Sequence, residues 1–276
     1  MSPNISIITA SYNAAKYIQK CIDSVAEQTY PHIEHIVADG ASQDGTVEII
    51  QNNADKLSWW ASEPDTGIYH AWNKALQHAR GEWILFLGAD DRLANPHVLE
   101  KIVTHLKNAY PDYRLVYGKL NLVNASGRIL KTVGEPFNTY KGKYEHGRIK
   151  LPAHPETFHH RSLFEEKGFD ESFRIAGDSD FLIRELKKRP ALFVPEIITI
   201  MTFGGTSGSP HNTLIRWKEC RRIMKKHKLK IPFHILIWQR IKNLSEFAIF
   251  SIFRQKTAYK LFDMIRQLSG KEKCWT

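Results

Sequence analysis

The segment 81–93, which reads GEWILFLGADDRL, restricts the fold of this chain more than any other segment. Its apolar run, residues 83–87, has the length and composition of a strand that is buried on both faces of a parallel sheet. Two adjacent carboxylates, Asp90 and Asp91, follow the run. Ligands of open α/β sheets bind where the carboxyl ends of the strands emerge, so we expect this acidic pair at a functional edge.

The acidic pair has two interpretations. Neighbouring carboxylates repel each other, and a hard divalent cation that is bound by oxygen ligands and by a substrate diphosphate would offset that repulsion. The alternative is a solvated turn, because Asp is a common turn former. Two segments nearer the N-terminus favour the cation, since they bring further polar loops to the same predicted edge.

The chain begins with two units of strand, loop and helix. Residues 5–9 are rich in β-formers and precede a polar loop, and residues 14–27 then place apolar side chains at helical spacing. Residues 33–38 form a second strand pattern, which ends in Asp39 and a turn rich in Gly and Asp. This alternation predicts an α/β fold with a mostly parallel sheet, helices on both faces, and Thr9 and Asp39 at neighbouring strand ends.

Three motifs occur in a fixed order, namely ITASYNAAKYIQKCIDSV, VADGASQDGT and FLGADD. In this order and spacing they resemble the inverting family-two glycosyltransferases of the GT-A fold, particularly bacterial enzymes that build surface polysaccharides such as capsules and O-antigens. The resemblance covers residues 4–208. It implies a Rossmann-like sheet, transfer of one sugar from a nucleotide sugar, with UDP as the expected nucleotide, and dependence on Mn²⁺ or Mg²⁺.

The resemblance also implies roles for individual residues. Thr9 and Asp39 are expected to contact the base of the nucleotide, with Tyr12 packing nearby. Asp90 is expected on the ribose side, and Asp91 is expected to hold the metal that bridges the diphosphate, with Asp90 as a second metal ligand.

The segment EPDTGIY, which contains Asp65, resembles a loop that lines the nucleotide pocket of the family. Asp65 is therefore a candidate donor contact, although a helical pattern over residues 68–79 makes ordinary packing the alternative for much of this region. The chain departs from the family at two positions. Many relatives carry an Arg where Trp72 stands and another Asp where Gly88 stands.

The reaction needs a group that takes the proton of the attacking hydroxyl, and a carboxylate beside the acceptor serves this purpose. In FDESFRIAGDSDFLIREL, residues 169–186, the family's catalytic base corresponds to Asp178. Asp178 also lies where a helix begins, so an N-cap is its alternative or additional role. Asp180 is expected to support the base or to cap the helix.

Three histidines lie upstream of this segment, at positions 154, 159 and 160. Their spacing matches no zinc-site pattern, and no Cys lies near them. The resemblance places His154 beside the acceptor pocket, where it is expected to bind phosphate or acceptor. His159 and His160 are expected to be structural.

The positive charge of the chain is concentrated at its C-terminal end. Residues 207–276 contain 16 Lys or Arg and 4 Asp or Glu. The other 206 residues contain 23 Lys or Arg and 25 Asp or Glu. Basic and aromatic residues alternate there, which predicts an amphipathic helical extension, residues 210–276, on an anionic membrane surface. Packing of these helices on the catalytic domain is the alternative. No apolar run approaches the roughly 18 residues of a membrane span, and no nucleic-acid-binding motif is present.

We therefore predict a catalytic domain over residues 1–209, with a nucleotide-sugar half at 4–110 and an acceptor half at 111–205. Scattered cysteines and an N-terminus without a charged leader predict a cytoplasmic protein, peripheral on the inner face of the membrane. There it would meet a saccharide acceptor carried on polyprenyl diphosphate. Two other functions stay open: a sugar nucleotidyltransferase, and a non-catalytic scaffold that binds nucleotide or membrane.

Overall fold

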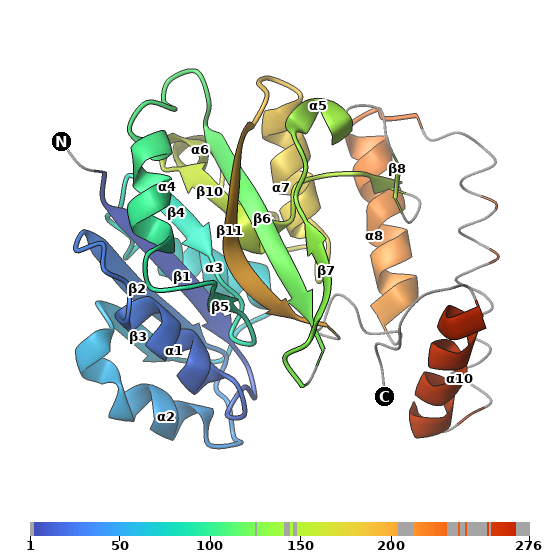
Figure 1. Ribbon diagram of the computed structural model, residues 1–276, viewed down its shortest axis with the longest axis horizontal. Helices are drawn as coiled ribbons and strands as arrows, with labels where there is room; N and C mark the ends of the chain where they lie inside the picture. The colour runs from blue at the N-terminus through green and yellow to red at the C-terminus, as the bar shows by residue number, and fades with distance from the viewer. Residues whose placement is uncertain are drawn as a thin grey trace.

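The computed structural model describes residues 3–124, 126–140, 144–145, 148–203, 212–230, 237, 241, 253 and 255–268. A nine-stranded mixed sheet crosses the molecule, and helices cover both of its faces (Figure 1). The strand order is β3-β2-β1-β4-β10-β6-β11-β5, with β7 paired to β6. The α/β architecture with a mostly parallel sheet is the one that the sequence predicts.

Most strands of the large sheet are parallel. The parallel strands are β1 (Ile5–Ser11), β2 (Ile33–Asp39), β3 (Trp59–Ser62), β4 (Trp83–Phe86), β6 (Leu115–Val123) and β11 (Leu192–Thr202). Three short strands run against them, namely β5 (Arg92–Leu93), β7 (Ile129–Val133) and β10 (Thr157–His160). A separate two-stranded sheet contains β8 (Tyr144–Glu145) and β9 (Arg148–Ile149).

The alternation of side chains along the strands divides the core into two layers. Ile5 and Ile7 pack with α1 (Ile18–Ala26) and α4 (Val98–Leu106) on one face. Ile8 packs on the other face with α3 (Ile68–Leu76), α6 (Ser162–Glu166), α7 (Gly177–Leu186) and α8 (Thr213–Lys226). The other helices with described bounds are α2 (Thr46–Asn52), α5 (Phe137–Tyr140), α10 (Gln255–Leu268), η1 (Ala54–Lys56) and η2 (His154–Glu156).

The chain leaves β4 and crosses the carboxyl edge of the sheet. The next strand, β5, pairs with β11, although β10 and β6 lie between β4 and β11 in the strand order. The crossing segment carries Asp90 and Asp91, and the Thr202 hydroxyl at the end of β11 donates to the Asp90 carbonyl oxygen at 3.2 Å. The acidic pair therefore lies at the sheet edge where the sequence predicts it.

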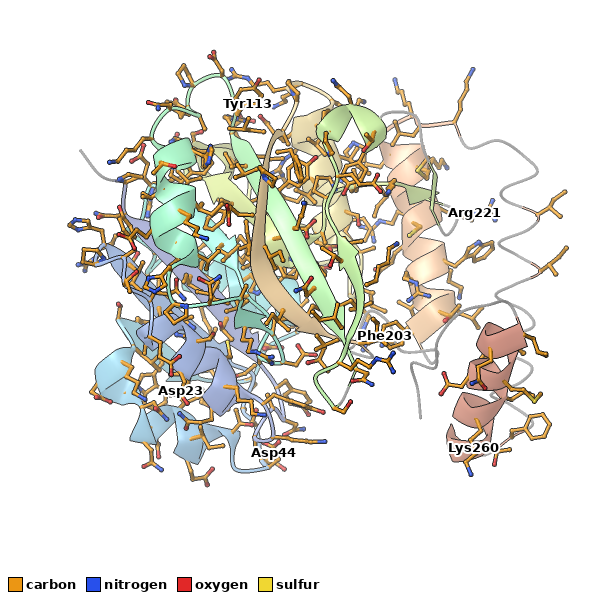
Figure 2. The ribbon with its side chains drawn as sticks, viewed as in Figure 1. Asp23, Asp44, Tyr113, Phe203, Arg221 and Lys260 are labelled. Carbon is orange, nitrogen blue, oxygen red and sulfur yellow. The ribbon has the colours of Figure 1, made fainter. Side chains whose placement is uncertain are left out.

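Part of the basic C-terminal region packs on the catalytic domain. Helix α8 buries Cys220, Ile223 and Met224, which supports the packing alternative for residues 212–230. Helix α10 leaves Leu268 82% exposed, and Figure 2 shows Lys260 of α10 on the opposite side of the molecule from α1. Apart from residues 237, 241 and 253, the other residues of 210–276 lie outside the described part of the chain. Among the described residues, no helix combines the length and apolar character that crossing a membrane requires.

Candidate active site

The loops that follow β1 and β2 are tied to each other. The backbone N–H of Asn13 donates to the Ser42 hydroxyl at 2.8 Å, and the backbone N–H of Ala15 donates to the Asp44 carboxylate at 3.0 Å. The loop of Asp44 projects at the lower edge of Figure 2. These bonds join two loops that are far apart in the sequence. Together the loops form one surface at the carboxyl ends of neighbouring strands.

The Asp39 carboxylate lies beneath that surface and is almost fully buried. It accepts hydrogen bonds from the hydroxyls of Ser11 at 2.8 Å, Ser42 at 2.6 Å and Ser62 at 2.7 Å. The three serines come from the ends of β1 and β3 and from the loop after β2. Asp39 therefore ties together three segments at the carboxyl edge of the sheet. Its contact with the base of the nucleotide stays a prediction.

The structure does not bring the Thr9 side chain to the edge of the sheet. Its side chain is fully buried, and its hydroxyl oxygen lies 3.0 Å from His35 Nε2 and 3.6 Å from Cys21 Sγ. Alternation along β1 directs Thr9 toward α1, on the same side as Ile5 and Ile7. This geometry favours a packing role for Thr9.

The side chains of Tyr12 and Asp65 both lie close to Gly40. A β-carbon on Gly40 would lie 2.6 Å from Asp65 Oδ2 and 3.3 Å from Tyr12 Cδ2, so the bare backbone provides the space for both side chains. The Tyr12 ring is 69% exposed, and the other oxygen of Asp65 accepts the backbone N–H of Gly67 at 2.8 Å. An exposed aromatic face beside a fixed carboxylate suits a flat base that also carries N–H groups.

The carboxylates of Asp90 and Asp91 crowd around Gly88. A β-carbon there would lie 2.7 Å from Asp91 Oδ2 and 3.0 Å from Asp90 Oδ1, so the two acids occupy the space that a side chain at this position would need. Burial raises the pKa of Asp91 well above its usual value, and the charge of Asp90 raises it further. Burial also raises the pKa of Asp90.

This pair fits a divalent cation. Asp91 Oδ1 is buried and has no hydrogen-bond partner among the described residues, and a buried carboxylate oxygen without a partner is costly unless a cation compensates it. Across the same part of the chain, no group of three or more His, Cys, Asp or Glu side chains is arranged to hold a metal. A cation bound here would therefore take its other oxygen ligands from a diphosphate and from water.

Asp178 lies in the first turn of α7, whose N-cap, Ala176, makes no side-chain cap bond. Tyr69 of α3 binds this turn: its hydroxyl accepts the backbone N–H of Gly177 at 2.8 Å and lies 3.5 Å from Asp178 Oδ1, to which it donates. Burial raises the pKa of Tyr69 well above its usual value, so the phenol stays protonated. Asp178 Oδ1 also accepts the backbone N–H of Ser179 at 2.6 Å, so Asp178 is oriented within the turn and does not serve as its N-cap.

An aromatic wall runs from Tyr69, which donates to Asp178, to Phe86, which comes four residues before Asp90. The Tyr69 ring lies edge-on to Trp72 with centroids 5.6 Å apart, and Trp72 lies 4.8 Å from Phe86, the last residue of β4. Phe86 comes two residues before Gly88. The start of α7 and the end of β4 are therefore held to the same wall, on the face of the sheet that α3 covers.

His154 lies inside this wall and is only 4% exposed. Its ring stacks on Trp72 at 5.0 Å and on Phe86 at 5.1 Å, and neither ring nitrogen has a hydrogen-bond partner among the described residues. Burial, followed by the neighbouring His159, lowers the pKa of His154 well below its usual value, so the ring is neutral. The structure thus places His154 beneath the site surface, and its predicted contact with acceptor or phosphate stays a prediction.

Two of the residues that organise the site did not emerge from the sequence. Tyr69 stands in the quoted EPDTGIY segment, but its bonds to residues 177 and 178 depend on the packing of α3 against α7. The sequence marks Trp72 only as a replacement for the Arg of many relatives, whereas in the structure its ring stacks on His154.

Comparisons of the sequence with known proteins identify the family of this chain. Residues 6–173 match the family model described as Glycosyl transferase family 2. An uncharacterized glycosyltransferase of Mycobacterium tuberculosis is 34% identical over 201 residues, which cover 72% of each chain. A PGL/p-HBAD biosynthesis glycosyltransferase of Mycobacterium bovis is 28% identical over 87% of this chain and 91% of that protein. The chain belongs to glycosyltransferase family 2.

Solved structures share its fold. The mannosyltransferase PcManGT from Pyrobaculum calidifontis, in complex with GDP-Man and Mn²⁺, gives a TM-score of 0.64 at 20% identity and covers 98% of this chain and 81% of that one. S. aureus TarS 1-349 in complex with UDP gives a TM-score of 0.62 at 19% identity, and the match covers 94% of this chain and 75% of that one. A longer TarS chain is matched over 39% of its length. At these identities the likeness concerns the fold, which is GT-A.

Proposed function

We propose that this chain is an inverting glycosyltransferase that moves one sugar from a UDP-linked donor to a hydroxyl of a saccharide acceptor in bacterial surface-polysaccharide synthesis. The observation that supports the proposal is a row of aromatic rings from Tyr69, which donates to Asp178, to Phe86, which comes four residues before Asp90 and five before Asp91. Adjacent acids suit a cation and a diphosphate, and a separate, oriented acid suits proton transfer.

The reaction is a direct displacement at the anomeric carbon. The acceptor oxygen forms a bond to that carbon from the face opposite the diphosphate, and the bond from the carbon to the diphosphate oxygen breaks with its electron pair. The hydroxyl proton passes to Asp178, which Tyr69 and the Ser179 backbone N–H hold in place. One displacement inverts the configuration of the sugar.

The donor is proposed to lie along the first half of the domain, residues 4–110. Tyr12 packs on the base, Asp65 accepts from it, Asp39 supports the loops beneath it, and Asp90 faces the ribose. Asp91, together with Asp90, would hold Mn²⁺ or Mg²⁺, which supplies positive charge to the departing diphosphate. The complexes of TarS with UDP and of PcManGT with GDP-Man and Mn²⁺ support a nucleotide-sugar donor and a cation.

The acceptor is proposed to be a saccharide on polyprenyl diphosphate, bound by residues 111–205, with His154 contributing from below. The M. bovis relative is named for PGL/p-HBAD biosynthesis, and a Bacillus subtilis relative, 40% identical over 93 residues, is described as a putative teichuronic acid biosynthesis glycosyltransferase. These names support a bacterial glycoconjugate as the product. A lipid-linked acceptor also fits a peripheral position on the inner face of the membrane.

The products of the reaction test this proposal. We expect wild-type protein, incubated with a panel of nucleotide sugars and Mn²⁺, to release a nucleoside diphosphate and to be stabilised in thermal unfolding by its own donor, since a ligand of the folded state raises stability by mass action. Release of pyrophosphate from a sugar phosphate and a nucleoside triphosphate would instead identify a nucleotidyltransferase. Donor binding without turnover on any lipid-linked acceptor would favour a scaffold.

Membrane attachment has its own prediction. Helix α10 exposes Met264 at 51% and Leu268 at 82%, in a region that carries 16 Lys or Arg. We expect the full chain to co-sediment with phosphatidylglycerol vesicles, less in high salt, and Met264→Glu with Leu268→Glu to lower the partition coefficient about tenfold or more. Ile129→Glu, at a 54% exposed site on β7, is the matched control and should bind as wild type does. Equal binding of all three proteins would remove α10 from the proposal.

A further inference from the structure

Glu219 of α8 binds the turn that leads into α7. Its carboxylate accepts three consecutive backbone N–H groups, from Arg174 at 2.6 Å, Ile175 at 3.0 Å and Ala176 at 2.9 Å. Glu219 is buried, with 8% of its surface exposed. Successive N–H groups that point at one carboxylate form an anion-binding nest, and the positive end of a helix follows directly here.

This arrangement fixes the start of α7 without using Asp178. Glu219 binds the N–H groups of residues 174–176, and the Tyr69 hydroxyl binds that of Gly177. A β-carbon on Gly177 would lie 2.8 Å from the Tyr69 ring, so the backbone is packed directly against the phenol. Asp178 is the next residue. Its backbone is thus set between a carboxylate on one helix and a phenol on another.

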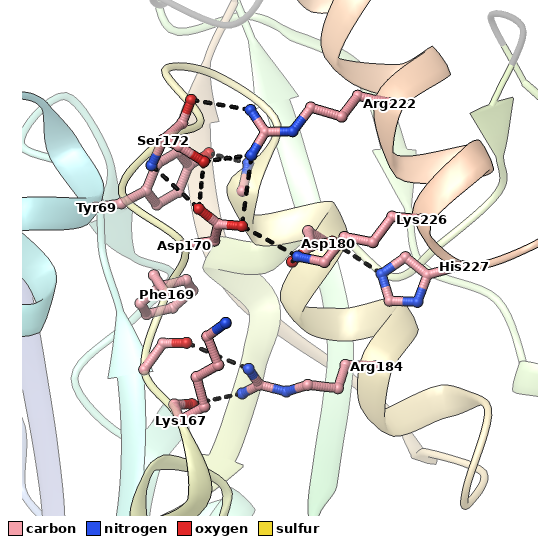
Figure 3. A network of polar contacts seen from close by, with 12 residues as sticks. Tyr69, Lys167, Phe169, Asp170, Ser172, Asp180, Arg184, Arg222, Lys226 and His227 are labelled. Carbon is pink, nitrogen blue, oxygen red and sulfur yellow. Dashed lines mark hydrogen bonds and ion pairs between the residues drawn. The ribbon is translucent and has the colours of Figure 1, made fainter.

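The rest of α8 is fastened to the same region, as Figure 3 shows. The Asp180 carboxylate accepts from Lys226 Nζ and His227 Nε2, each at 2.8 Å. Lys226 also reaches Asp170 at 3.1 Å, and the Arg222 guanidinium lies 4.0 Å from the centre of the Phe173 ring. These contacts join α8 to α7 and to the loop before it, so Glu219 reaches the nest from a helix whose position is itself fixed.

We propose that Glu219 is a positioning residue for the catalytic base: through the backbone nest at 174–176 it holds Asp178 within hydrogen-bond reach of the attacking acceptor hydroxyl, as proton transfer requires. The first helix of the basic C-terminal region is then part of the catalytic unit. This inference rests on the proposed role of Asp178. Alignment of reacting groups is sensitive to displacement, and a shift of about 1 Å costs roughly 100-fold in rate.

The test is Glu219→Gln, in which one acceptor oxygen of the nest becomes an N–H donor that opposes a backbone N–H. We expect kcat of the folded fraction to fall about 10- to 100-fold, with the KM for donor changed less than about twofold. Glu219→Asp keeps the charge and should retain more activity than Glu219→Gln. Equal kcat values for wild type and Glu219→Gln would overturn the inference.

Glu185→Gln is the matched control for loss of stability. Glu185 is a buried acid in the last turn of α7, and its two oxygens bind Arg114 Nε at 2.9 Å and Nη2 at 2.6 Å. The Glu185→Gln variant should lower Tm as much as Glu219→Gln does, or more, while leaving kcat of the folded fraction near wild type. A fall of kcat that simply follows Tm in both variants would show that Glu219 is only structural.

A double-mutant cycle separates this inference from the proposed function. In the wild-type background, Glu219→Gln is expected to lower the single-turnover rate about 10- to 100-fold. If Glu219 acts through Asp178, the same substitution should change that rate less than about twofold in an Asp178→Asn background. Additive losses would overturn the positioning role. Wild-type turnover by Asp178→Asn alone would contradict the assignment of the base, whereas a strong loss in Asp178→Asn beside an active Glu219→Gln would contradict only the inference.

Discussion

Asp178→Asn is expected to lower kcat by about 10²- to 10⁴-fold while leaving the Kd for the nucleotide-sugar donor unchanged, because removal of a general base costs about this much. Asn keeps the oxygen that accepts the Ser179 N–H and lies 3.5 Å from the Tyr69 hydroxyl, so the fold of the turn is preserved and only the proton acceptor is lost. Steady-state release of nucleoside diphosphate measures kcat, and calorimetry measures donor binding.

The control for this variant is Glu171→Gln. Glu171 lies in the loop before α7, is exposed, and accepts from the Asn73 side chain at 2.7 Å. Its replacement should leave kcat within about twofold of wild type, since surface changes are usually small in effect. Retention of more than about a tenth of wild-type kcat by Asp178→Asn would show that another group takes the proton.

Asp91→Asn is expected to abolish the stabilisation that a nucleoside diphosphate and Mn²⁺ give together, and to lower kcat/KM at least 100-fold. A cation at a developing negative charge contributes several kcal/mol, and each 1.36 kcal/mol is about tenfold in rate. Without ligand, Tm should stay level or rise, because the substitution removes a buried carboxyl group whose Oδ1 has no partner among the described residues. Thermal unfolding with and without both ligands measures each effect.

Asp44→Asn provides the comparison for Asp91. Asp44 is an exposed acid on a loop at the same edge, bound to the backbone N–H groups of Ala15 at 3.0 Å and Thr46 at 3.1 Å. It should keep the joint stabilisation by nucleotide and Mn²⁺. If Asp91→Asn also keeps it, the cation is bound elsewhere and the proposed site is wrong.

The sequence predicted the features that depend on local pattern. An apolar run followed by two acids placed Asp90 and Asp91 correctly at the carboxyl edge, because a strand buried on both faces has few other arrangements. The same rule of alternation assigns Thr9 to the α1 face, with Ile5 and Ile7. Its position near a strand end suggested a ligand contact, but the direction of its side chain decides its environment.

The sequence could not predict contacts between distant segments. Asp39 is bound by three serines from three separate parts of the chain, and no spacing rule connects them. Glu219 offered one signal, since it is the single acidic residue within the basic stretch 212–230. Its partners are backbone N–H groups, which leave no mark in a sequence, so only the packing of α8 against α7 identifies them.

A crystal structure of the wild-type chain with UDP and Mg²⁺ tests the central claim most directly. We predict a cation bound by Asp91, with Mg²⁺ to oxygen distances of about 2.1 Å, that also contacts the diphosphate, and the Asp178 carboxylate facing the outer phosphate across an open acceptor space. A nucleotide bound away from Asp90 and Asp91, or an Asp178 carboxylate turned away from the diphosphate, would contradict the convergence of the three acids on one reaction.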